Sequence, residues 1–322
     1  MHKFSVAPMM DWTDRHCRVF HRLLSKEVQL WTEMITTKAI IYGDKNRLLD
    51  FDAVERPLVL QLGGSEPDEM AQCAKMAQDW GYDEVNINVG CPSDRVQSGR
   101  FGACLMQTPE IVADCVDAMR QASDISVSVK SRIGVDDMDS YDELVDFVAQ
   151  VEKAGCDSFV IHARKAWLKG LSPKENRSVP PLNYDWVYQI KRDFPQLNIG
   201  INGGITSIES SQQHLEYVDS VMLGRAAYHQ PYLLSEVDSM IYQKTVKKNS
   251  TLSREQVLLR FIDYIKTQNN QGVPIRSMTR HILGLYHAQP NAKKFRQLLS
   301  GKVVELTHLY QWLDFLDSGR QV

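Results

Sequence analysis

One lysine in this sequence stands where it could do chemistry. Lys130 follows residues 125–129, an apolar and β-branched run typical of a buried strand. A lysine at the end of such a strand loses hydration, which favours its neutral form unless an anion lies beside it. Lys130 therefore predicts either an anionic ligand at the strand end or the Schiff-base lysine of an aldolase, and this residue alone does not separate the two.

A cysteine occupies a similar position. Cys91 lies in residues 88–93, just after another expected strand, and the glycines of residues 98–103 follow it, as in a mobile lid. A thiol with an ordinary pKa of about 8.5 is mostly protonated at neutral pH and can donate a proton. A nucleophilic thiolate would need a cationic neighbour, and no His or Lys lies within several residues of Cys91 along the chain. The position favours a proton donor.

Two glycine-containing segments near the end of the apolar pattern predict a phosphate site. Asn202-Gly203-Gly204 precedes a helix that we expect to open at Thr206, and Gly224-Arg225 follows the next apolar run. Glycines allow backbone N–H groups to approach a phosphate, while a helix N-terminus and an arginine supply positive potential. A lone Gly-Gly is more often a turn, so the prediction depends on the two segments acting together.

The elements that must position these residues alternate between strands and helices. Short β-branched or apolar runs begin near Phe4, Val28, Pro57, Asp83, Ile125, Asp157, Asn198 and Val218. Helical segments separate most of them, among them 66–80, 109–122 and 141–154, with caps and glycine stops at their ends. The pattern predicts the α/β class, with residues 1–243 forming a (β/α)8 TIM barrel.

In such a barrel the carboxyl ends of all strands meet at one face, where the active site lies. Polar or glycine residues recur at these ends. Strand by strand they are Pro8-Met9-Met10, Glu33, Gln61, Asn88 with Cys91, Lys130, His162, Asn202-Gly203-Gly204 and Gly224-Arg225. One such residue would more often close a hydrogen bond than bind a ligand, but their recurrence at the same end predicts one shared site.

From about Pro231 the alternation stops and the chain is predicted to be helical. The expected helices are 232–242, 254–267, 275–285, 292–299 and 302–316, with a polar linker at 244–250 and a C-terminal all-helical domain at 244–322. Residues 251–322 carry ten Lys and Arg residues and five Asp and Glu residues, a net charge of +5, whereas the whole chain has a net charge of −3. The basic tail is typical of a phosphate-binding surface.

A second basic segment follows the sixth expected strand. Residues 164–177 contain five Lys and Arg residues (Arg164, Lys165, Lys169, Lys174 and Arg177) and only one acid, together with Trp167, and a Pro-Pro pair follows at 180–181. A solvated charged loop would also explain this composition. Because the loop rises from the predicted active face and the tail is basic as well, we favour a track for a nucleic-acid backbone that runs between the two.

The remaining composition narrows the class. The six cysteines form no C-x-x-C pair and no Cys/His cluster at zinc spacing, so we expect no metal and no disulfide framework. Apart from Cys91 they are expected to be inert. Because no secretory segment or long apolar run is present, we expect a cytoplasmic protein without membrane contact, and a monomer.

Three segments carry a resemblance to a known family. Residues 7–15 and 88–93 together resemble the pair of signatures of the tRNA-dihydrouridine synthases, and the resemblance covers essentially the whole chain. Residues 164–177 are similar to the stretch that marks the bacterial A subfamily. One departure is the lid, where much of the family has Gly-Ala-Gly and this chain has Gly99-Arg100-Phe101-Gly102.

The resemblance implies FMN as the bound cofactor and NADPH as a transient reductant. The implied FMN contacts are Pro8, Met9, Met10, Gln61, Lys130, His162, Asn202, Gly203, Gly204, Gly224 and Arg225. It also implies Cys91 as the proton donor, and tRNA contacts at Asn88, Lys174, Arg177 and Lys293. The tail, residues 244–322, would then be a helical tRNA-binding domain beside an FMN-binding catalytic barrel.

The implied reaction is reduction of the C5–C6 double bond of a D-loop uridine, around positions 20 and 20a of tRNA. NADPH would reduce FMN, the flavin would give a hydride from N5 to C6, and Cys91 would protonate C5. Lys130 and His162 would stabilise the charge that develops around the flavin and base carbonyls. No G-x-G-x-x-G motif opens a βαβ unit, so NADPH should bind only at the flavin face.

Three other functions fit parts of the pattern. An FMN barrel acting on a free pyrimidine, like a dihydroorotate dehydrogenase, leaves the basic tail unexplained. A Schiff-base aldolase would use Lys130 and would be colourless. An RNA chaperone without catalysis would not need Cys91.

Overall fold

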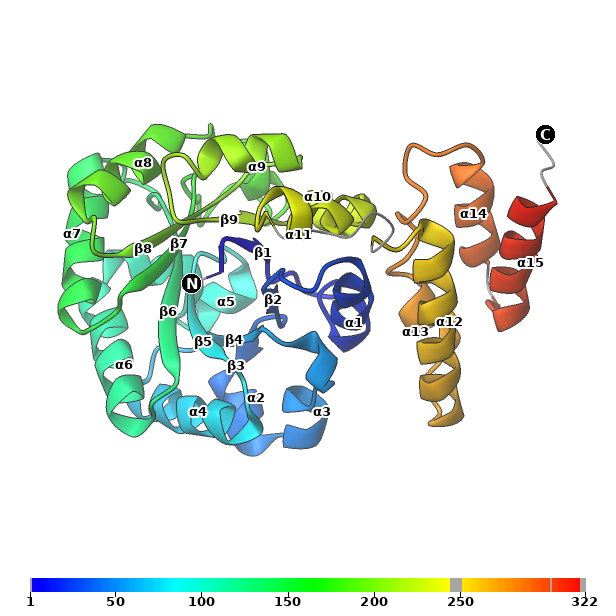
Figure 1. Cartoon of the computed structure of the whole chain (residues 1–322). Helices are drawn as coiled ribbons and strands as arrows, with labels where there is room; N and C mark the ends of the chain where they lie inside the picture. Colours follow the sequence, from blue (N-terminus) through cyan, green and yellow to red (C-terminus); the bar gives the residue numbers. More distant parts are fainter. Residues whose placement is uncertain (1, 244–250, 302, 319–322) are drawn as a thin grey trace.

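The computed structural model describes residues 2–243, 251–301 and 303–318. Its centre is a parallel sheet in the order β1-β9-β8-β7-β6-β5-β4-β2, with β3 also paired to β4 (Figure 1). The strands are β1 Phe4–Val6, β2 Leu30–Trp31, β3 Ile35–Thr36, β4 Leu58–Gly63, β5 Glu84–Val89, β6 Ser126–Arg132, β7 Ser158–His162, β8 Asn198–Asn202 and β9 Ser220–Leu223. All eight predicted strands are confirmed within a few residues.

The sheet closes on itself between its first and last members. Ser5 bridges to Gln29 in parallel, and backbone hydrogen bonds of 3.0 Å join Val6 N to Gln29 O and Gln29 N to Phe4 O. Because β2 and β3 pair with the two ends of β4, they act together as one interrupted strand. The predicted (β/α)8 TIM barrel is therefore confirmed, with a break in its second strand that the sequence did not reveal.

Helices surround the barrel. They are α1 Arg15–Leu24, α2 Thr37–Tyr42, α3 Lys45–Leu49, α4 Pro67–Trp80, α5 Asp94–Ser98, α6 Pro109–Ala122, α7 Tyr141–Lys153, α8 Tyr184–Asp193, α9 Ile208–His214 and α10 Arg225–His229. Short 3₁₀ segments lie at Ala53–Glu55 (η1), Gly102–Gln107 (η2) and Glu175–Arg177 (η3). Some predicted helix signals hold: Gly81 ends α4 with φ 86°, and Ser140 and Glu143 form a capping box on α7. The N-cap residues of α4 and α6, Glu66 and Thr108, make no side-chain capping hydrogen bond.

The two faces of the sheet bury different residues. On β5, Val85, Ile87 and Val89 pack into the large core shared with the helices. The alternate residues face the barrel interior, as the two-residue period of a strand requires. Part of that interior is an apolar cluster of Ala7, Trp31, Val59, Val160 and Met222, and the rest is polar.

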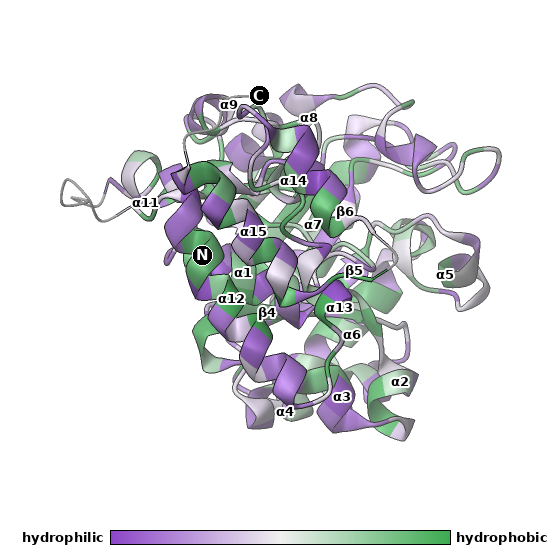
Figure 2. Ribbon diagram, turned by 90° about the vertical axis from the view of Figure 1, so that its right-hand side faces the viewer, coloured by the Kyte–Doolittle hydropathy of each residue, from purple (hydrophilic) through white to green (hydrophobic). Residues whose placement is uncertain are grey.

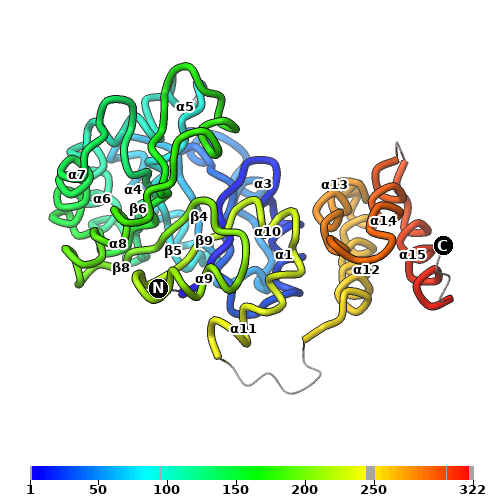
Figure 3. Tube along the Cα trace, turned by 90° about the horizontal axis from the view of Figure 1, so that it is seen from above, coloured from blue at the N-terminus to red at the C-terminus, as the bar shows by residue number. Residues whose placement is uncertain are grey.

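The C-terminal helices form a separate group that packs on α1 (Figures 1 and 3). After η4 Pro231–Glu236 and α11 Val237–Met240, they are α12 Arg254–Asn270, α13 Ile275–Thr279, α14 Ala292–Leu299 and α15 Leu306–Asp317. Figure 2 shows hydrophobic and hydrophilic residues interleaved along α12, as expected of a helix with one buried face. The linker predicted at 244–250 lies outside the described residues.

Two of the predicted C-terminal helices were too long. The segment 275–285 is helical only to Thr279. Further along, the backbone at Gly284 approaches His229 so closely that a Cβ there would lie 2.3 Å from the His229 carbonyl oxygen. The segment 232–242 is split between a 3₁₀ turn and α11. The helix expected from 302 begins at Leu306, and residue 302 is not among those described.

Paired charges hold this helical group to the barrel. Asp14, which caps α1, accepts a hydrogen bond from Arg280 at 2.6 Å, and its carboxylate lies 3.0 Å from His281 Nε2. His16 Nδ1 lies 2.8 Å from the Tyr264 hydroxyl. Within the barrel domain, Arg18 on α1 forms a 2.5 Å ion pair with Glu55 in η1 that is almost fully buried. Arg18 and Arg280 thus each have a carboxylate partner.

Candidate active site at the mouth of the barrel

The predicted strand-end residues come together because neighbouring strands are in register. Asn88 pairs with Lys130 across β5 and β6, and His162 pairs with Asn202 across β7 and β8. Gln61 on β4 lies within hydrogen-bonding reach of Asn88, with 2.8 Å between Asn88 Nδ2 and Gln61 Oε1. One face of the barrel therefore carries this part of the predicted set.

The loop of Cys91 is organised by the residue at the end of β5. The Asn88 side-chain oxygen accepts hydrogen bonds from the backbone amides of Gly90, at 3.1 Å, and Cys91, at 3.0 Å. The thiol of Cys91 is half-buried and lies 3.5 Å from the Ser93 hydroxyl. Because both polar ends of the Asn88 side chain are engaged, its main visible role is to hold Cys91. A tRNA contact by Asn88 stays a prediction.

The predicted lid, residues 98–103, lies over the end of β4. Arg100 and Gly102 adopt φ values of 55° and 79°, and the Ala103 amide donates to the Cys91 carbonyl at 2.9 Å. The ring of Phe101 packs so closely on Gly63 that a Cβ there would lie 2.7 Å from it. Phe101 thus fastens this segment to the barrel, while lid motion stays a prediction.

Lys130 and His162 have strongly shifted pKa values. Burial, together with the nearby Arg132, lowers the pKa of Lys130 to about 7. Burial and the cations Arg132 and Lys130 hold the pKa of His162 well below its usual range, so its imidazole is neutral at pH 7. Among the described residues Lys130 has no salt-bridge partner, which is the condition under which an anionic ligand would restore its charge.

The glycines of the predicted phosphate site are required by the backbone. Gly203 and Gly204 adopt φ values of 111° and 73°, and a Cβ on Gly203 would lie 2.5 Å from the His162 ring. The Tyr184 hydroxyl donates to the Gly203 carbonyl at 2.8 Å and fixes the turn. The helix predicted to open at Thr206 begins instead at Ile208, because Ser207 forms its capping box.

Arg132 was missed by the sequence analysis. It is 3% exposed, and its guanidinium donates to the carbonyls of Gly90 at 3.0 Å, Asn176 at 2.9 Å and Lys165 at 3.3 Å. It thus joins the Cys91 loop to the basic loop after β7, and burial lowers its pKa to about 10. An inward residue two positions after Lys130 on the same strand was the available signal.

Asn176 was also missed, and it organises the basic loop from within. It is fully buried, accepts from the Trp167 amide at 2.8 Å and donates to the Trp167 and Leu171 carbonyls at 2.9 and 3.1 Å. This arrangement leaves Lys174 and Arg177 exposed. Arg225 Nη2 donates to the Arg177 carbonyl at 3.0 Å, so the loops after β7 and β9 meet.

Positively charged side chains therefore cluster at the mouth. Burial, with a contribution from neighbouring cations, lowers the pKa values of Lys130, Arg132, Arg164 and Arg177. Among the described residues, no carboxylate forms a salt bridge with any of these four or with Arg225. Arg164 carries a buried Nε without a hydrogen-bond partner. Such a group is costly unless an anion joins it.

The segments that follow β1 and β2 contribute an acidic residue and apolar residues to the mouth. Glu33 lies between β2 and β3, accepts a 2.5 Å hydrogen bond from the Asp11 amide, and has a pKa raised by burial. Met9 is partly buried, whereas Met10 is 58% exposed. Pro8 and these two methionines form an apolar wall beside Gly224, where a Cβ would lie 3.7 Å from the Met9 sulfur.

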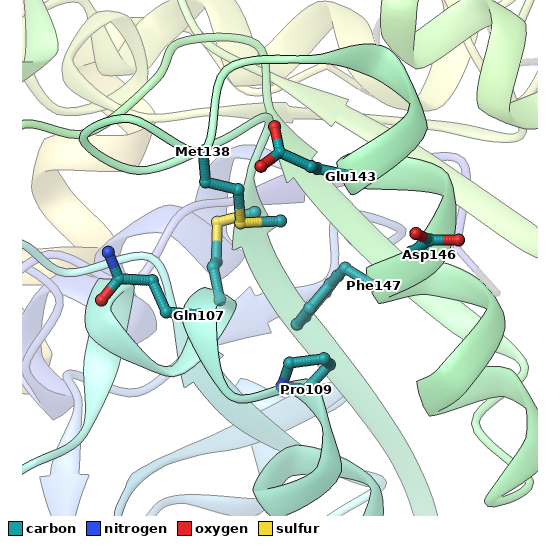
Figure 4. A pocket seen from close by; sticks show the side chains of 7 residues that line it. Gln107, Pro109, Met138, Glu143, Asp146 and Phe147 are labelled. Carbon is teal, nitrogen blue, oxygen red and sulfur yellow. The ribbon is translucent and has the colours of Figure 1, made fainter.

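Other predicted or possible sites lie elsewhere. Lys293 is exposed on α14, apart from the barrel in Figures 1 and 3. The cavity in Figure 4, of about 290 Å³, lies between η2, α6 and α7, and its Glu143 is engaged in capping α7. In the described part of the chain, no group of three metal-binding side chains occurs, and no helix is long and apolar enough to cross a membrane.

Comparisons with known proteins agree with this geometry. The family model described as dihydrouridine synthase (Dus) matches residues 5–314. A tRNA-dihydrouridine(20/20a) synthase of Xanthomonas campestris is 56% identical over 298 residues, 92% of this chain and 88% of the relative. One of Synechocystis is 57% identical over 296 residues, and one of Pseudomonas aeruginosa is 57% identical over 298. These cover 92% of this chain and 88% and 89% of the relatives.

A solved structure shares the fold. The complex of 2-naphthoyl-CoA reductase with 2-naphthoyl-CoA matches with a TM-score of 0.57 and 11% identity. The match covers 73% of this chain and 49% of that one. At this identity the likeness concerns the fold alone.

Proposed function

This chain belongs to the dihydrouridine synthase family, and from that premise we propose that it reduces uridines 20 and 20a of tRNA with FMN as its bound cofactor and NADPH as its reductant. It is a flavin-dependent oxidoreductase that forms dihydrouridine in tRNA. Family membership decides against the aldolase, free-pyrimidine and chaperone alternatives. The positions 20 and 20a are those named for the relatives.

The observation that carries the cofactor proposal is the cluster of cations without acidic partners beside a half-buried thiol. The left-handed turn at Gly203 and Gly204, together with Gly224-Arg225, suits the phosphate of FMN. The apolar wall of Pro8, Met9 and Met10 suits the flavin ring. The other residues proposed to hold FMN are Gln61, Lys130, His162 and Asn202.

When bound, FMN supplies the hydride that the C6 atom of uridine receives. Cys91 gives the proton to C5, because its thiol lies at the mouth in a loop fixed by Asn88 and Arg132. Lys130 and the neutral imidazole of His162 donate hydrogen bonds toward carbonyl oxygens on which negative charge develops. The residues of the chain thus position groups and move one proton.

A uridine in folded tRNA must leave its stack to reach this site. Lys174 and Arg177 on the loop after β7, with Lys293 on α14, would contact the tRNA, as would Asn88 at the mouth. Residues 244–322 would form the helical tRNA-binding domain beside the catalytic barrel of 1–243. We also expect a cytoplasmic monomer.

Two measurements test the function. Purified protein should carry a yellow flavin that NADPH bleaches, and tRNA from a strain without the protein should lose dihydrouridine at positions 20 and 20a. Colourless protein that gains no absorbance with added FMN would contradict the cofactor. Dihydrouridine that persists at both positions in the deleted strain would contradict the substrate.

The role of Cys91 is tested by Cys91→Ala. The variant should bind FMN and accept electrons from NADPH as before, but dihydrouridine formation should fall by roughly 10²- to 10⁴-fold because the proton donor is lost. Cys104→Ala, which changes a half-buried thiol in η2, is the control and should keep full turnover. Equal turnover in Cys91→Ala and the wild type would remove Cys91 from the mechanism.

A further inference from the structure

The polar half of the barrel interior forms a continuous column of side chains. From the mouth downward, the donor–acceptor steps are Asn88 Nδ2 to Gln61 Oε1 at 2.8 Å, Gln61 Nε2 to Asn86 Oδ1 at 2.9 Å, and Asn86 Nδ2 to Ser128 Oγ at 2.9 Å. Ser128 Oγ then donates to Glu84 Oε1, and Gln29 Nε2 donates to Glu84 Oε2 at 3.2 Å. Glu84 lies at the amino-terminal end of β5, so the column spans the barrel.

The direction of this column is fixed by its upper end. The amides of Gly90 and Cys91 are backbone N–H groups, which can only donate, so Asn88 must turn its oxygen toward them. Its NH₂ group then faces Gln61, and the same reasoning sets the orientation of Gln61 and Asn86 in turn. Ser128 is left to donate its hydrogen downward, and Glu84 is the group that accepts it.

The lower end imposes the same direction independently. Both oxygens of Glu84 accept hydrogen bonds, from Ser128 and Gln29, as an ionised carboxylate does. Burial raises the pKa of Glu84, and these two hydrogen bonds oppose that rise. Because both ends of the column require the same donor-to-acceptor direction, its side chains have a single orientation. A serine and three amides without these two ends could be hydrogen-bonded in either direction.

Such a column is costly in the interior of a barrel. Asn86 is fully buried and Ser128 and Gln61 are each 1% exposed, at positions that barrels usually fill with branched apolar side chains. Buried polar groups cost free energy unless every one is hydrogen-bonded, and apolar residues would fill the same space more simply. The orientation that the column imposes on Asn88 and Gln61 explains why polar residues stand here.

From this geometry we propose that Glu84, Ser128 and Asn86 are positioning residues for the reaction: they fix the orientation of Gln61 and Asn88, and through Asn88 the backbone of the proton donor Cys91. The catalytic part rests on the proposed function. The structural part, which concerns the amides of Gly90 and Cys91, does not.

The test compares two serines on one strand. Ser128→Ala removes the hydroxyl that links Asn86 to Glu84. Ser131→Ala removes a hydroxyl that is buried three residues further along β6 without a hydrogen-bond partner. In flavin-loaded Ser128→Ala, exchange of the Gly90 and Cys91 amides with deuterium should quicken by about tenfold, and reoxidation of the reduced enzyme by tRNA should slow by about tenfold. Reduction by NADPH should stay unchanged, and Ser131→Ala should match the wild type in all three.

A second pair isolates the acceptor at position 84. Glu84→Gln keeps an oxygen for Ser128 and an NH₂ for a turned Gln29, and should behave like the wild type. Glu84→Met keeps neither and should behave like Ser128→Ala. Because both variants remove the charge, the difference between them measures the hydrogen bond alone.

The outcomes separate three cases. If folded Ser128→Ala and Glu84→Met keep wild-type exchange at Gly90 and Cys91, or if exchange quickens equally in every barrel strand, the column is only structural and the proposal is overturned. If exchange changes as expected but reoxidation by tRNA does not, the catalytic part is overturned. A wild-type protein that forms no dihydrouridine would instead contradict the proposed function and leave the exchange result to judge the column.

Discussion

Two regions of this protein contain cations, and they differ in whether those cations have acidic partners. At the junction where the C-terminal helices pack on α1, Arg18 of α1 is paired with Glu55, and Arg280 is paired with Asp14. At the mouth, Arg132 donates only to backbone carbonyls, and Lys130 has no acidic partner among the described residues.

The pKa values follow the same division. The Glu55 carboxylate raises the pKa of Arg18 against the opposing effect of burial. Burial lowers the pKa of Lys130 and Arg132, where no carboxylate opposes it. A cation whose partner is in the chain serves the fold, whereas a cation left without one is available to an anion from outside.

The largest effect is expected at the junction. Arg18→Met leaves the Glu55 carboxylate buried without a partner, and should lower the free energy of unfolding by about 3–5 kcal/mol. Arg225→Met, at the exposed rim of the mouth, should change it by less than about 0.5 kcal/mol. Urea denaturation of the flavin-free proteins, followed by circular dichroism, measures both.

The double variant Arg18→Met with Glu55→Leu is the control for the junction. Because it removes both charges, it should recover much of the lost stability. A single variant Arg18→Met that is as stable as the wild type would mean that this pair does not hold the fold.

The division also marks what the sequence could predict. The eight strands, the helices beside them and the strand-end residues followed from apolar periodicity and from the geometry of a barrel. The pairing of Asp14 with His281 could not be foreseen, because it joins residues 267 positions apart. The column below Asn88 was hidden for a similar reason: Asn86 and Ser128 look like ordinary polar residues in strands until the register places them opposite each other.

Arg132 and Asn176 were missed because their partners are backbone carbonyls. Every residue has such a group, so the sequence does not mark these partners. Element ends were also misjudged, as in the helix expected over 275–285, which ends at Thr279. Local propensity fixes where an element can form, and packing decides where it stops.

At the mouth, removing a cation should weaken ligand binding without lowering the stability of the fold. Lys130→Met should raise the dissociation constant of FMN by roughly 10- to 100-fold, the equivalent of a charge-assisted hydrogen bond of about 1.5–3 kcal/mol. The stability of the flavin-free protein should not fall, because a desolvated charge has been removed. Titration of flavin fluorescence gives the constant, with Lys153→Met on the opposite end of the barrel as control. If Lys130→Met binds FMN with unchanged affinity, Lys130 does not contact the cofactor.

The exposed cations should have a smaller effect that depends on salt. Lys174→Glu should weaken tRNA binding several-fold and lower the slope of log affinity against log salt by about 1, since one phosphate contact is lost. Lys153→Glu makes the same change of charge on an exposed residue away from the mouth and should bind tRNA normally. If the two variants have the same salt slope, the loop after β7 is not part of the tRNA surface.

The last expected effect is a dependence of stability on pH, and comparing the wild type with Lys130→Met isolates the contribution of Lys130 to it. Its pKa in the folded protein is about 7, whereas an unfolded lysine has a pKa of about 10.4. Between these values the unfolded chain binds a proton that the folded chain does not, so this group makes the flavin-free protein more stable as pH rises from 7. Below pH 7 both states are protonated and the cost of the buried charge is fully present.

Thermal unfolding between pH 6 and pH 9 should therefore show Lys130→Met gaining most over the wild type at the low end and less toward the high end. Bound FMN should flatten this difference, because an anion beside the ammonium restores its pKa and gives the unpaired charge the partner that junction cations already have. Curves for the two proteins that run parallel across this range without flavin would show that the mouth does not hold Lys130 as a desolvated charge. The contrast between the two regions would then not extend to this lysine.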